Sequence, residues 1–392
     1  MLFCPTFRPA EFSRCSPRPS PGAGSYNGRV IPAIRALIVL SLVLVSAAPP
    51  AAQSRGADSF ASRIAALSEP GGYFDTDNLI SNERSYLHVV PALLQARTTG
   101  GAYIGVGPDQ NFSYIAHVRP AVAILIDIRR DNLLLHLLFK ALFELSATRV
   151  EYLANLTGRA PPPRPADWAR ATIDEIVAHV DRAPLLTPAG RQPMQARIAA
   201  AVARTAVPLS AADRATIDRF HGRFIEAGLS LRFNSAGRPP QADYPTYRDL
   251  LLEVDRTGAR RSFLAADADF LFVKRLQADD QVIPVVGDLA GPKALAGIGT
   301  FLAARKLRVA ALYTSNVEFY LFRQGSFDRF AANVARLPLA ESGVLVRSAF
   351  GGAARAERGY NSASLTQPLR AFVDGVASGR IRGYGALLAA SK

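Results

Sequence analysis

Short apolar runs alternate with helical patterns along most of the chain. Five runs are typical of buried strands: residues 102–106, 121–127, and stretches within 281–291, 308–316 and 343–350. The segments between them predict helices: residues 109–117, 132–147, 292–306 and 317–322. Apolar strands that alternate with helices favour a mostly parallel sheet covered on both faces. We therefore predict an α/β fold with a Rossmann-like, doubly wound sheet.

The stretch between the second and third predicted strands has a different character. A proline-rich connector, residues 158–167, precedes apolar residues at helical spacing, and Ser210 is a good N-cap for one of these helices. No strand is predicted between residues 147 and 280. The pattern predicts a leader and three folded segments: leader 1–52, first part of the Rossmann-like domain 59–146, helical insertion 147–243, and second part of the domain 244–392.

The leader contains one apolar run, ALIVLSLVLVSAA at residues 36–48, which follows Arg29 and Arg35. Since a spanning helix needs about 20 apolar residues, this run favours a signal peptide over a stable membrane span. We expect an exported, periplasmic protein, with an uncleaved N-terminal anchor as the alternative. Cys4 and Cys15 both precede the run, so the mature chain would have no disulfide framework and no cysteine nucleophile.

Charge and histidine spacing narrow the classes of partner. The formal net charge is +14, of which residues 1–53 contribute +4, and the other basic residues are mostly scattered arginines. This distribution favours a basic soluble surface, and no nucleic-acid-binding motif is present. The five histidines show no metal-ligand spacing, so no metal site is predicted.

A glycine turn after the first strand is the first candidate for chemistry. Gly105 and Gly107 let the backbone turn and let a ligand approach, and Asp127 follows at the end of the second strand, where a carboxylate can bind ribose hydroxyls. Asp109 and Gln110 stand where a third glycine would fall. We predict a small-molecule cofactor site with Asp109 among its residues; the alternative is a tight strand-to-helix turn.

Polar residues also follow the later strands. Asp288, Ser315 and Asn316 are predicted to bind the cofactor because the carboxyl ends of parallel strands meet in one crevice. Asp288 has a second interpretation, as the N-cap of the next helix. Arg129 and Arg130 favour local ion pairs over an anion contact.

Two asparagines and a glutamate precede the first strand. Asn78, Asn82 and Glu83 are candidates for lid or substrate contacts, and the alternative is capping and loop hydrogen bonding.

Taken together, these motifs resemble those of a known class of enzymes. The order GVG, DIRRDN, VVGD and YTSN resembles the class I S-adenosylmethionine-dependent methyltransferases. With the string FDTDNLISNERSYLHVVPAL, the chain is similar to an uncharacterised bacterial family with that methyltransferase-like fold. The resemblance implies contacts of Gly105 and Gly107 with the amino-acid part of the cofactor, of Asp127 with ribose and of Asp288 near adenine. Tyr103 departs from it, because an acid commonly occupies that position.

Two functions of different classes follow. The first is an S-adenosylmethionine-dependent methyltransferase whose acceptor is unknown, with Glu318 or Glu83 as the base. The second is an exported, non-enzymatic Rossmann-like protein that binds a ligand or a partner, since S-adenosylmethionine is made in the cytoplasm. A dinucleotide dehydrogenase ranks third because the third glycine of its fingerprint is absent.

Overall fold

The computed structural model describes residues 58–96, 98–235, 241–351 and 356–392, which belong to one compact unit, residues 50–392. The predicted leader and both cysteines lie outside the described residues. Within the described residues, no helix is long and apolar enough to span a bilayer.

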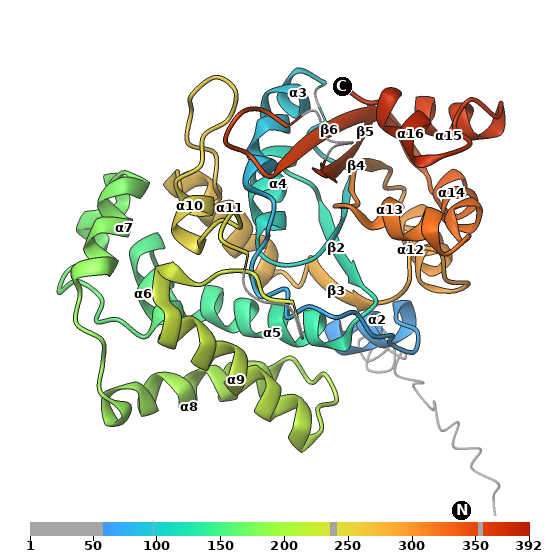
Figure 1. The fold of residues 1–392 in the computed structure, drawn as a ribbon. Coiled ribbons are helices and arrows are strands. Elements are labelled where there is room, and N and C mark those ends of the chain that lie inside the picture. Colours follow the sequence, from blue (N-terminus) through green and yellow to red (C-terminus); the bar gives the residue numbers. More distant parts are fainter. Residues whose placement is uncertain (1–57, 97, 236–240, 352–355) are drawn as a thin grey trace, which may run out of the picture. The chain divides into compact units, whose positions relative to one another are not determined.

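A six-stranded sheet forms the centre of this unit, in the order β3-β2-β1-β4-β5-β6 (Figure 1). The strands are β1 Ala102–Val106, β2 Val122–Asp127, β3 Val282–Val286, β4 Val309–Tyr313, β5 Leu339–Phe350 and β6 Ser362–Pro368. Neighbours from β3 to β5 run parallel, whereas β6 runs antiparallel to β5. The predicted α/β fold with a mostly parallel sheet is confirmed.

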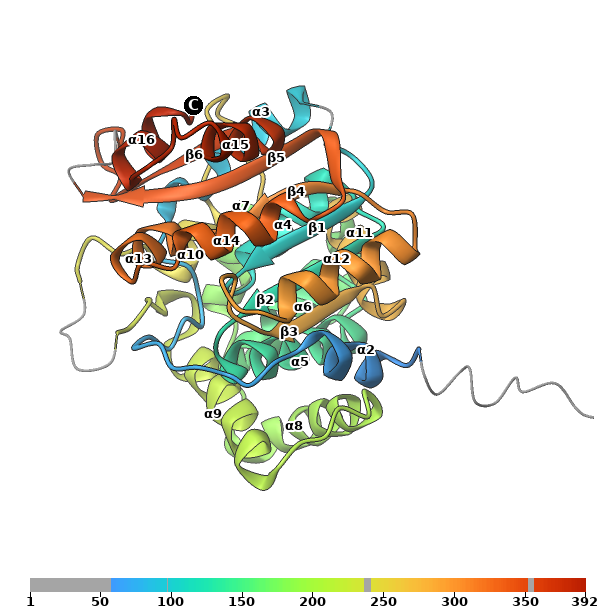
Figure 2. The same ribbon diagram turned by 90° about the vertical axis from the view of Figure 1, so that its right-hand side faces the viewer.

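Helices cover both faces of the sheet. On one side lie α4 Gln110–Val118, α5 Arg130–Leu145 and α11 Asp267–Ala278; on the other lie α2 Phe60–Leu67, α12 Ala294–Ala304, α14 Phe327–Ala335 and α15 Leu369–Ala377 (Figures 1 and 2). Shorter elements complete the sheet domain: η1 Arg84–Val89, α3 Val90–Gln95, α13 Val317–Arg323 and α16 Tyr384–Ala389. The helices predicted from the sequence are present, with ends displaced by about one or two residues, as is usual for helix boundaries.

The chain between β2 and β3 is helical after α5, as predicted. Its elements are α6 Arg149–Thr157, η2 Pro165–Arg170, α7 Ile173–Arg182, α8 Pro188–Arg204, α9 Ala211–Ala227, η3 Gly228–Ser230 and α10 Tyr247–Leu251, followed by α11. Among its described residues, β-pairing is limited to isolated bridges. Ser210 caps α9 by accepting a hydrogen bond from the Asp213 N–H, which confirms the predicted N-cap. Helices α8 and α9 pack on α5, and this explains why α5 is apolar nearly all round.

The segment before η1 crosses the carboxyl ends of β2 and β3. The Glu69 N–H donates to the Val286 carbonyl at 2.9 Å, and the Gly72 N–H donates to the Ile128 carbonyl at 2.7 Å. These contacts place residues 68–83 over the edge of the sheet where the strand ends meet.

Candidate functional site

A cavity of about 800 Å³ opens at the carboxyl ends of the parallel strands. Residues that follow β1, β2, β3 and β4 line it, together with the segment from Tyr73 to Glu83. The chain reverses its winding direction between β1 and β4, and open α/β sheets bind ligands at such a switch point. The volume lies within the range of small-molecule sites, roughly 300 to 1,000 Å³.

The cavity brings together most of the residues predicted from the sequence. Those that line it are Asn78, Asn82, Glu83, Gly107, Asp127, Asp288, Ser315 and Asn316. Three other predicted residues are absent from the lining: Gly105, Asp109 and Glu318.

Gly105 makes room for protein side chains. A Cβ atom at this position would meet Asn111 Oδ1 at 2.0 Å and the Tyr103 hydroxyl at 2.6 Å. That hydroxyl donates to Asn111 Oδ1 at 2.7 Å, beneath the turn. Tyr103, which replaces the acid common in the methyltransferases, thus supports the turn from inside the core.

Gly107 lies at the cavity surface, and its backbone conformation is what requires glycine at this position. Its φ of +85° is a left-handed conformation that L side chains rarely adopt. The Gly107 carbonyl accepts a hydrogen bond from Asn111 Nδ2 at 3.2 Å and lies 2.9 Å from His136 Nε2. Burial lowers the pKa of His136 to about 4, so a neutral imidazole donates this bond. Buried side chains of Asn111 and His136 therefore fix the glycine turn.

Asp109 and Glu318 are buried carboxylates with protein partners. Asp109 Oδ2 accepts a hydrogen bond of 2.6 Å from the Tyr247 hydroxyl, and burial raises the pKa of Asp109 to about 7. Glu318 Oε1 accepts from Arg347 Nε at 3.1 Å and from the Thr314 hydroxyl at 2.8 Å, and the side chains of the ion pair are each 1% exposed. Glu318 thus joins α13 to β5, and Asp109 joins the start of α4 to α10.

Asp127 is clamped by Arg129. Asp127 Oδ1 accepts from the Arg129 N–H at 2.9 Å and from Nε at 3.0 Å, while Oδ2 accepts from the second guanidinium nitrogen at 2.8 Å. Arg129 also donates to the Thr76 carbonyl at 2.9 Å, and Arg130 pairs with Asp213. Arg129 thus forms the local ion pair that was predicted, whereas the partner of Arg130 lies 83 residues away in the chain. Oδ2 keeps one acceptor position because a carboxylate oxygen has two lone pairs.

Asp288 does not cap the helix that follows it, so that interpretation was wrong. Helix α12 begins at Ala294, and its N-cap is Lys293. Glu69 takes the capping role: Oε2 accepts from the N–H groups of Lys293 and Ala294 at 3.1 and 3.2 Å, and Oε1 accepts from the Asp288 N–H at 2.8 Å. The Asp288 carboxylate holds its own turn by accepting from the Ala290 N–H at 2.8 Å.

Glu83 is the carboxylate that the structure places in the cavity wall among hydroxyl groups. Its side chain accepts hydrogen bonds from Tyr313 at 2.6 Å and from the Ser315 and Ser348 hydroxyls. Burial raises the pKa of Glu83, and the three hydroxyl donors oppose that shift. Gln110 Nε2 donates to the Tyr313 oxygen at 3.1 Å, so the network extends to the glycine turn.

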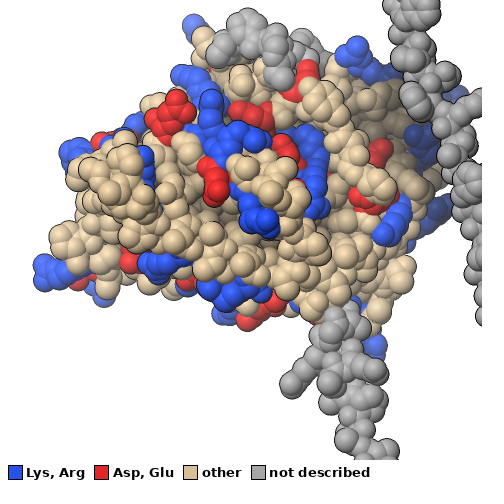
Figure 3. Space-filling view, turned by 90° about the horizontal axis from the view of Figure 1, so that it is seen from below, with Lys and Arg blue, Asp and Glu red and all other residues tan. Residues whose placement is uncertain are grey.

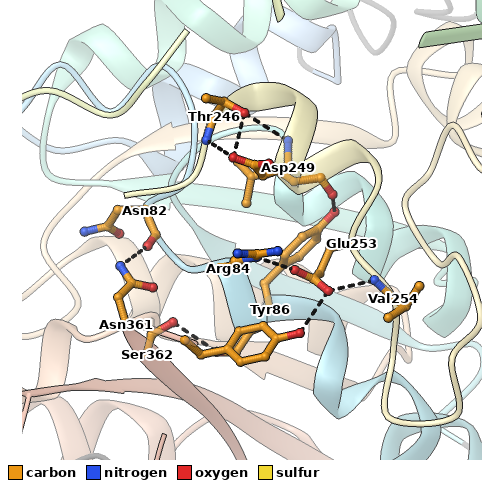
Figure 4. Close-up of polar contacts among 12 residues, drawn as sticks. Asn82, Arg84, Tyr86, Thr246, Asp249, Glu253, Val254, Asn361 and Ser362 are labelled. Atoms are coloured by element: carbon orange, nitrogen blue, oxygen red, sulfur yellow. Dashed lines mark hydrogen bonds and ion pairs between the residues drawn. The ribbon is translucent and has the colours of Figure 1, made fainter. Parts of the chain in front are cut away.

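A second network joins this segment to β6 and to α10 (Figure 4). Asn361 Nδ2 donates to the Asn82 carbonyl at 3.0 Å. Glu253, 5% exposed, accepts from Arg84 Nε at 2.9 Å and from the Tyr360 hydroxyl at 3.1 Å. The residues on both sides of Glu83 are therefore fixed, Asn82 by Asn361 and Arg84 by Glu253.

The lining also contains residues that the sequence analysis missed or assigned elsewhere. Gln110 lines the cavity, and its Oε1 is a buried acceptor without a hydrogen-bond partner. Asn361 was not predicted, because nothing in its sequence neighbourhood marks a strand end. Tyr320 also lines the cavity and packs edge-on against Phe74 at 5.0 Å between ring centroids.

The charge of the lining is opposite to that of the whole chain. Among the described residues, five acidic residues line the cavity (Asp75, Glu83, Asp127, Asp243 and Asp288), against one basic residue, Arg129. No group of three or more His, Cys, Asp or Glu among the described residues is placed to hold a metal ion. On the molecular face of Figure 3, basic side chains stand among acidic ones and form no continuous single-sign surface.

Comparison with known proteins assigns the chain to a protein family. A family model described as Domain of unknown function (DUF7790) matches residues 79–161 and 234–381, which is more than half of the chain. These two segments carry all six strands, and the stretch between them, 162–233, contains η2, α7, α8, α9 and η3. No curated protein matches the chain. By the extent of the family match, the protein belongs to the DUF7790 family.

Proposed function

We propose that the cavity binds S-adenosylmethionine and that the protein is a methyltransferase acting on a small acceptor. One observation carries this proposal: Gly107, Asp127 and Asp288, which come from three separate strand ends, line one cavity at the switch point of the sheet. Their residue types and order are those of the class that the sequence resembles. The remaining predicted ligands, Ser315 and Asn316, follow β4 and lie on the side of Glu83.

The residues present fit an adenosyl group. Gly107 leaves the turn open, since even an added Cβ would meet no atom closer than 3.4 Å. Asp127 keeps one acceptor position for a ribose hydroxyl, although Arg129 occupies the other three.

The charge of the lining favours a sulfonium over a diphosphate. Arg129 is the one basic residue in the described lining and is paired with Asp127, so phosphates would find no free cation there. The acidic lining suits a cofactor with a positive sulfonium centre.

Glu83 is the candidate proton acceptor. It lines the cavity, whereas Glu318 is paired with Arg347 and does not. Displacement at a sulfonium methyl depends mainly on alignment, and a buried carboxylate supplies the base when the acceptor must lose a proton.

Two features favour the second function, ligand binding without catalysis. Gln110 stands in place of the third glycine, and Arg129 holds the carboxylate predicted to bind ribose. Under this function the cavity would bind a small ligand or a protein partner, and no acceptor would be methylated.

Isothermal titration of the purified protein with S-adenosylmethionine and its demethylated product tests the proposal. We expect dissociation constants between micromolar and millimolar, and an affinity at least about tenfold lower for Gly107→Ala, which equals roughly 1.4 kcal/mol. Gly297→Ala is the matched control, because its Cβ would meet only Leu67 at 3.6 Å. Absence of binding by the unchanged protein at millimolar ligand would overturn the proposal. Binding without methyl transfer to any acceptor would favour the second function.

A further inference from the structure

Ser315 lies on a sharp turn between β4 and α13. Its φ is +54°, a left-handed conformation that is strained for a residue with a side chain. The turn is fixed on both sides, since the Thr314 N–H donates to the Val346 carbonyl at 3.0 Å and the Ser348 N–H donates to the Ser315 carbonyl at 2.7 Å. A strained strand-to-helix turn is the setting in which α/β hydrolases present a nucleophilic serine.

The Ser315 hydroxyl has a carboxylate as its partner. Its Oγ donates to Glu83 Oε1, while Tyr313 and Ser348 donate to Glu83 Oε2. A nucleophile, a base within hydrogen-bond reach and a third group that orients the base form the arrangement expected of an activated serine.

The nucleophile candidate, Ser315, is more exposed than its partner, Glu83. Both residues line the cavity, but Ser315 is half-buried, whereas Glu83 is only 1% exposed. Among the described residues, the side-chain donors to Glu83 are hydroxyl groups and include no lysine or arginine, so its carboxylate is available to take a proton. Burial raises the pKa of Glu83 and makes it a stronger base than an exposed glutamate.

We propose that Ser315 is a nucleophile, with Glu83 as its general base, for carboxylic ester substrates. Ser315 Oγ forms a bond to the carbonyl carbon as its proton passes to Glu83. The bond from that carbon to the ester oxygen then breaks, and Glu83 returns the proton to the departing alcohol. Water, deprotonated by Glu83, attacks the acyl-serine; the ester bond to Ser315 breaks, the acid leaves, and the proton returns to Ser315. This inference rests on the contacts of Ser315 and Glu83 and not on the cofactor.

The rest of the lining indicates which esters would fit. Aromatic rings surround the turn: Phe319 packs against Tyr320 and Tyr384, each at 5.4 Å between centroids. The acidic lining disfavours anionic and phosphorylated esters. We therefore expect neutral or cationic esters with an aromatic or apolar group. Asn316 also lines the cavity, and its Oδ1 lies 3.4 Å from Ser315 Oγ, so its side-chain amide group is the candidate donor to the developing oxyanion.

Covalent labelling with diisopropyl fluorophosphate, without any cofactor, tests the proposal. The serine oxygen displaces fluoride from phosphorus, and the proton is taken up by Glu83. We expect one phosphoryl adduct per chain in the intact mass spectrum, located at Ser315 by peptide mapping. Glu83→Gln, which keeps the shape of the side chain, should slow labelling at least about a hundredfold.

A second variant distinguishes loss of the nucleophile from loss of folding. Ser315→Gly removes the hydroxyl and relieves the positive φ, so the melting temperature should equal or exceed that of the unchanged protein while labelling is lost. Ser378→Ala, an exposed serine at the end of α15, should label at the unchanged rate. Absence of an adduct on the unchanged protein, or an adduct that persists in Ser315→Gly, would overturn the assignment.

Discussion

At the residue scale, three buried carboxyls differ in what compensates them. Glu318 has an arginine and Glu83 has three hydroxyl donors. Asp109 has a single side-chain donor, the Tyr247 hydroxyl, and burial raises its pKa to about 7. Since one neutral donor does not offset the loss of water around a charge, Asp109 should make stability depend on pH.

The replacement Asp109→Asn tests this dependence. The folded pKa lies above the unfolded value, so the contribution of Asp109 to stability is fully present below about pH 4 and is lost as pH rises through about 7. The free energy of unfolding of the variant relative to the unchanged protein should rise by roughly 2 to 4 kcal/mol between pH 4 and pH 8. Urea unfolding across that range measures it, with the exposed Asp374→Asn as control. Parallel profiles for the two proteins would contradict the assignment.

At the element scale, helix α12 takes its N-terminal capping group from a distant segment of the chain. Lys293, the N-cap of α12, makes no side-chain capping bond, and Glu69 supplies the acceptor from a segment more than 200 residues earlier in the chain. Glu69 also holds the N–H of Asp288. The same carboxylate therefore orders a helix end and a turn of the cavity.

Glu69→Ala should lower the free energy of unfolding by about 1 to 2 kcal/mol, because three backbone N–H groups lose their acceptor. Amide hydrogen exchange at Lys293 and Ala294 should accelerate before exchange in the strands does. The exposed Glu226→Ala in α9 serves as the control, with an expected change within about 0.5 kcal/mol. Unchanged exchange at the start of α12 would argue that another group caps the helix.

At the scale of the whole unit, the apolar core continues from the sheet into the helices between β2 and β3. Phe224 of α9 is fully buried, and its ring lies 6.1 Å from that of Phe139 in α5. The family match passes over residues 162–233, yet residues in that stretch share the core of the sheet domain. The insertion is thus a structural layer over α5.

Phe224→Ala should therefore lower the free energy of unfolding of the whole unit by about 3 to 5 kcal/mol, in a single transition. Leu185→Ala is the comparison within the same insertion; Leu185 is 46% exposed, and a change within about 0.5 kcal/mol is expected. Thermal unfolding followed by near-ultraviolet circular dichroism measures both. Two separate transitions in the Phe224 variant would indicate that the insertion melts independently.

The sequence alone allowed the fold to be predicted where local pattern and packing agree. Strands β1 to β4 had nearly continuous apolar runs because both of their faces are covered, and β5 had the shorter apolar run GVLV. The sixth, SASLTQP in β6, has no such run: it is an edge strand, ordered by pairing with β5. The strand ends also predicted most of the cavity, since the ends of parallel strands meet at one edge of the sheet.

What each residue does in that cavity depended on the tertiary structure. Gly105 and Gly107 look alike in the sequence, yet one makes room for the Tyr103–Asn111 bond and the other turns beside the cavity. Glu83 and Glu318 were equal candidates until the fold placed an arginine beside only one of them. Local sequence determines periodicity and turn chemistry, but the hydrogen-bond partners of a buried polar group come from segments far away in the chain. That is why the sequence indicated where the cavity lies, and only the folded structure showed which of its polar groups are paired with other protein groups.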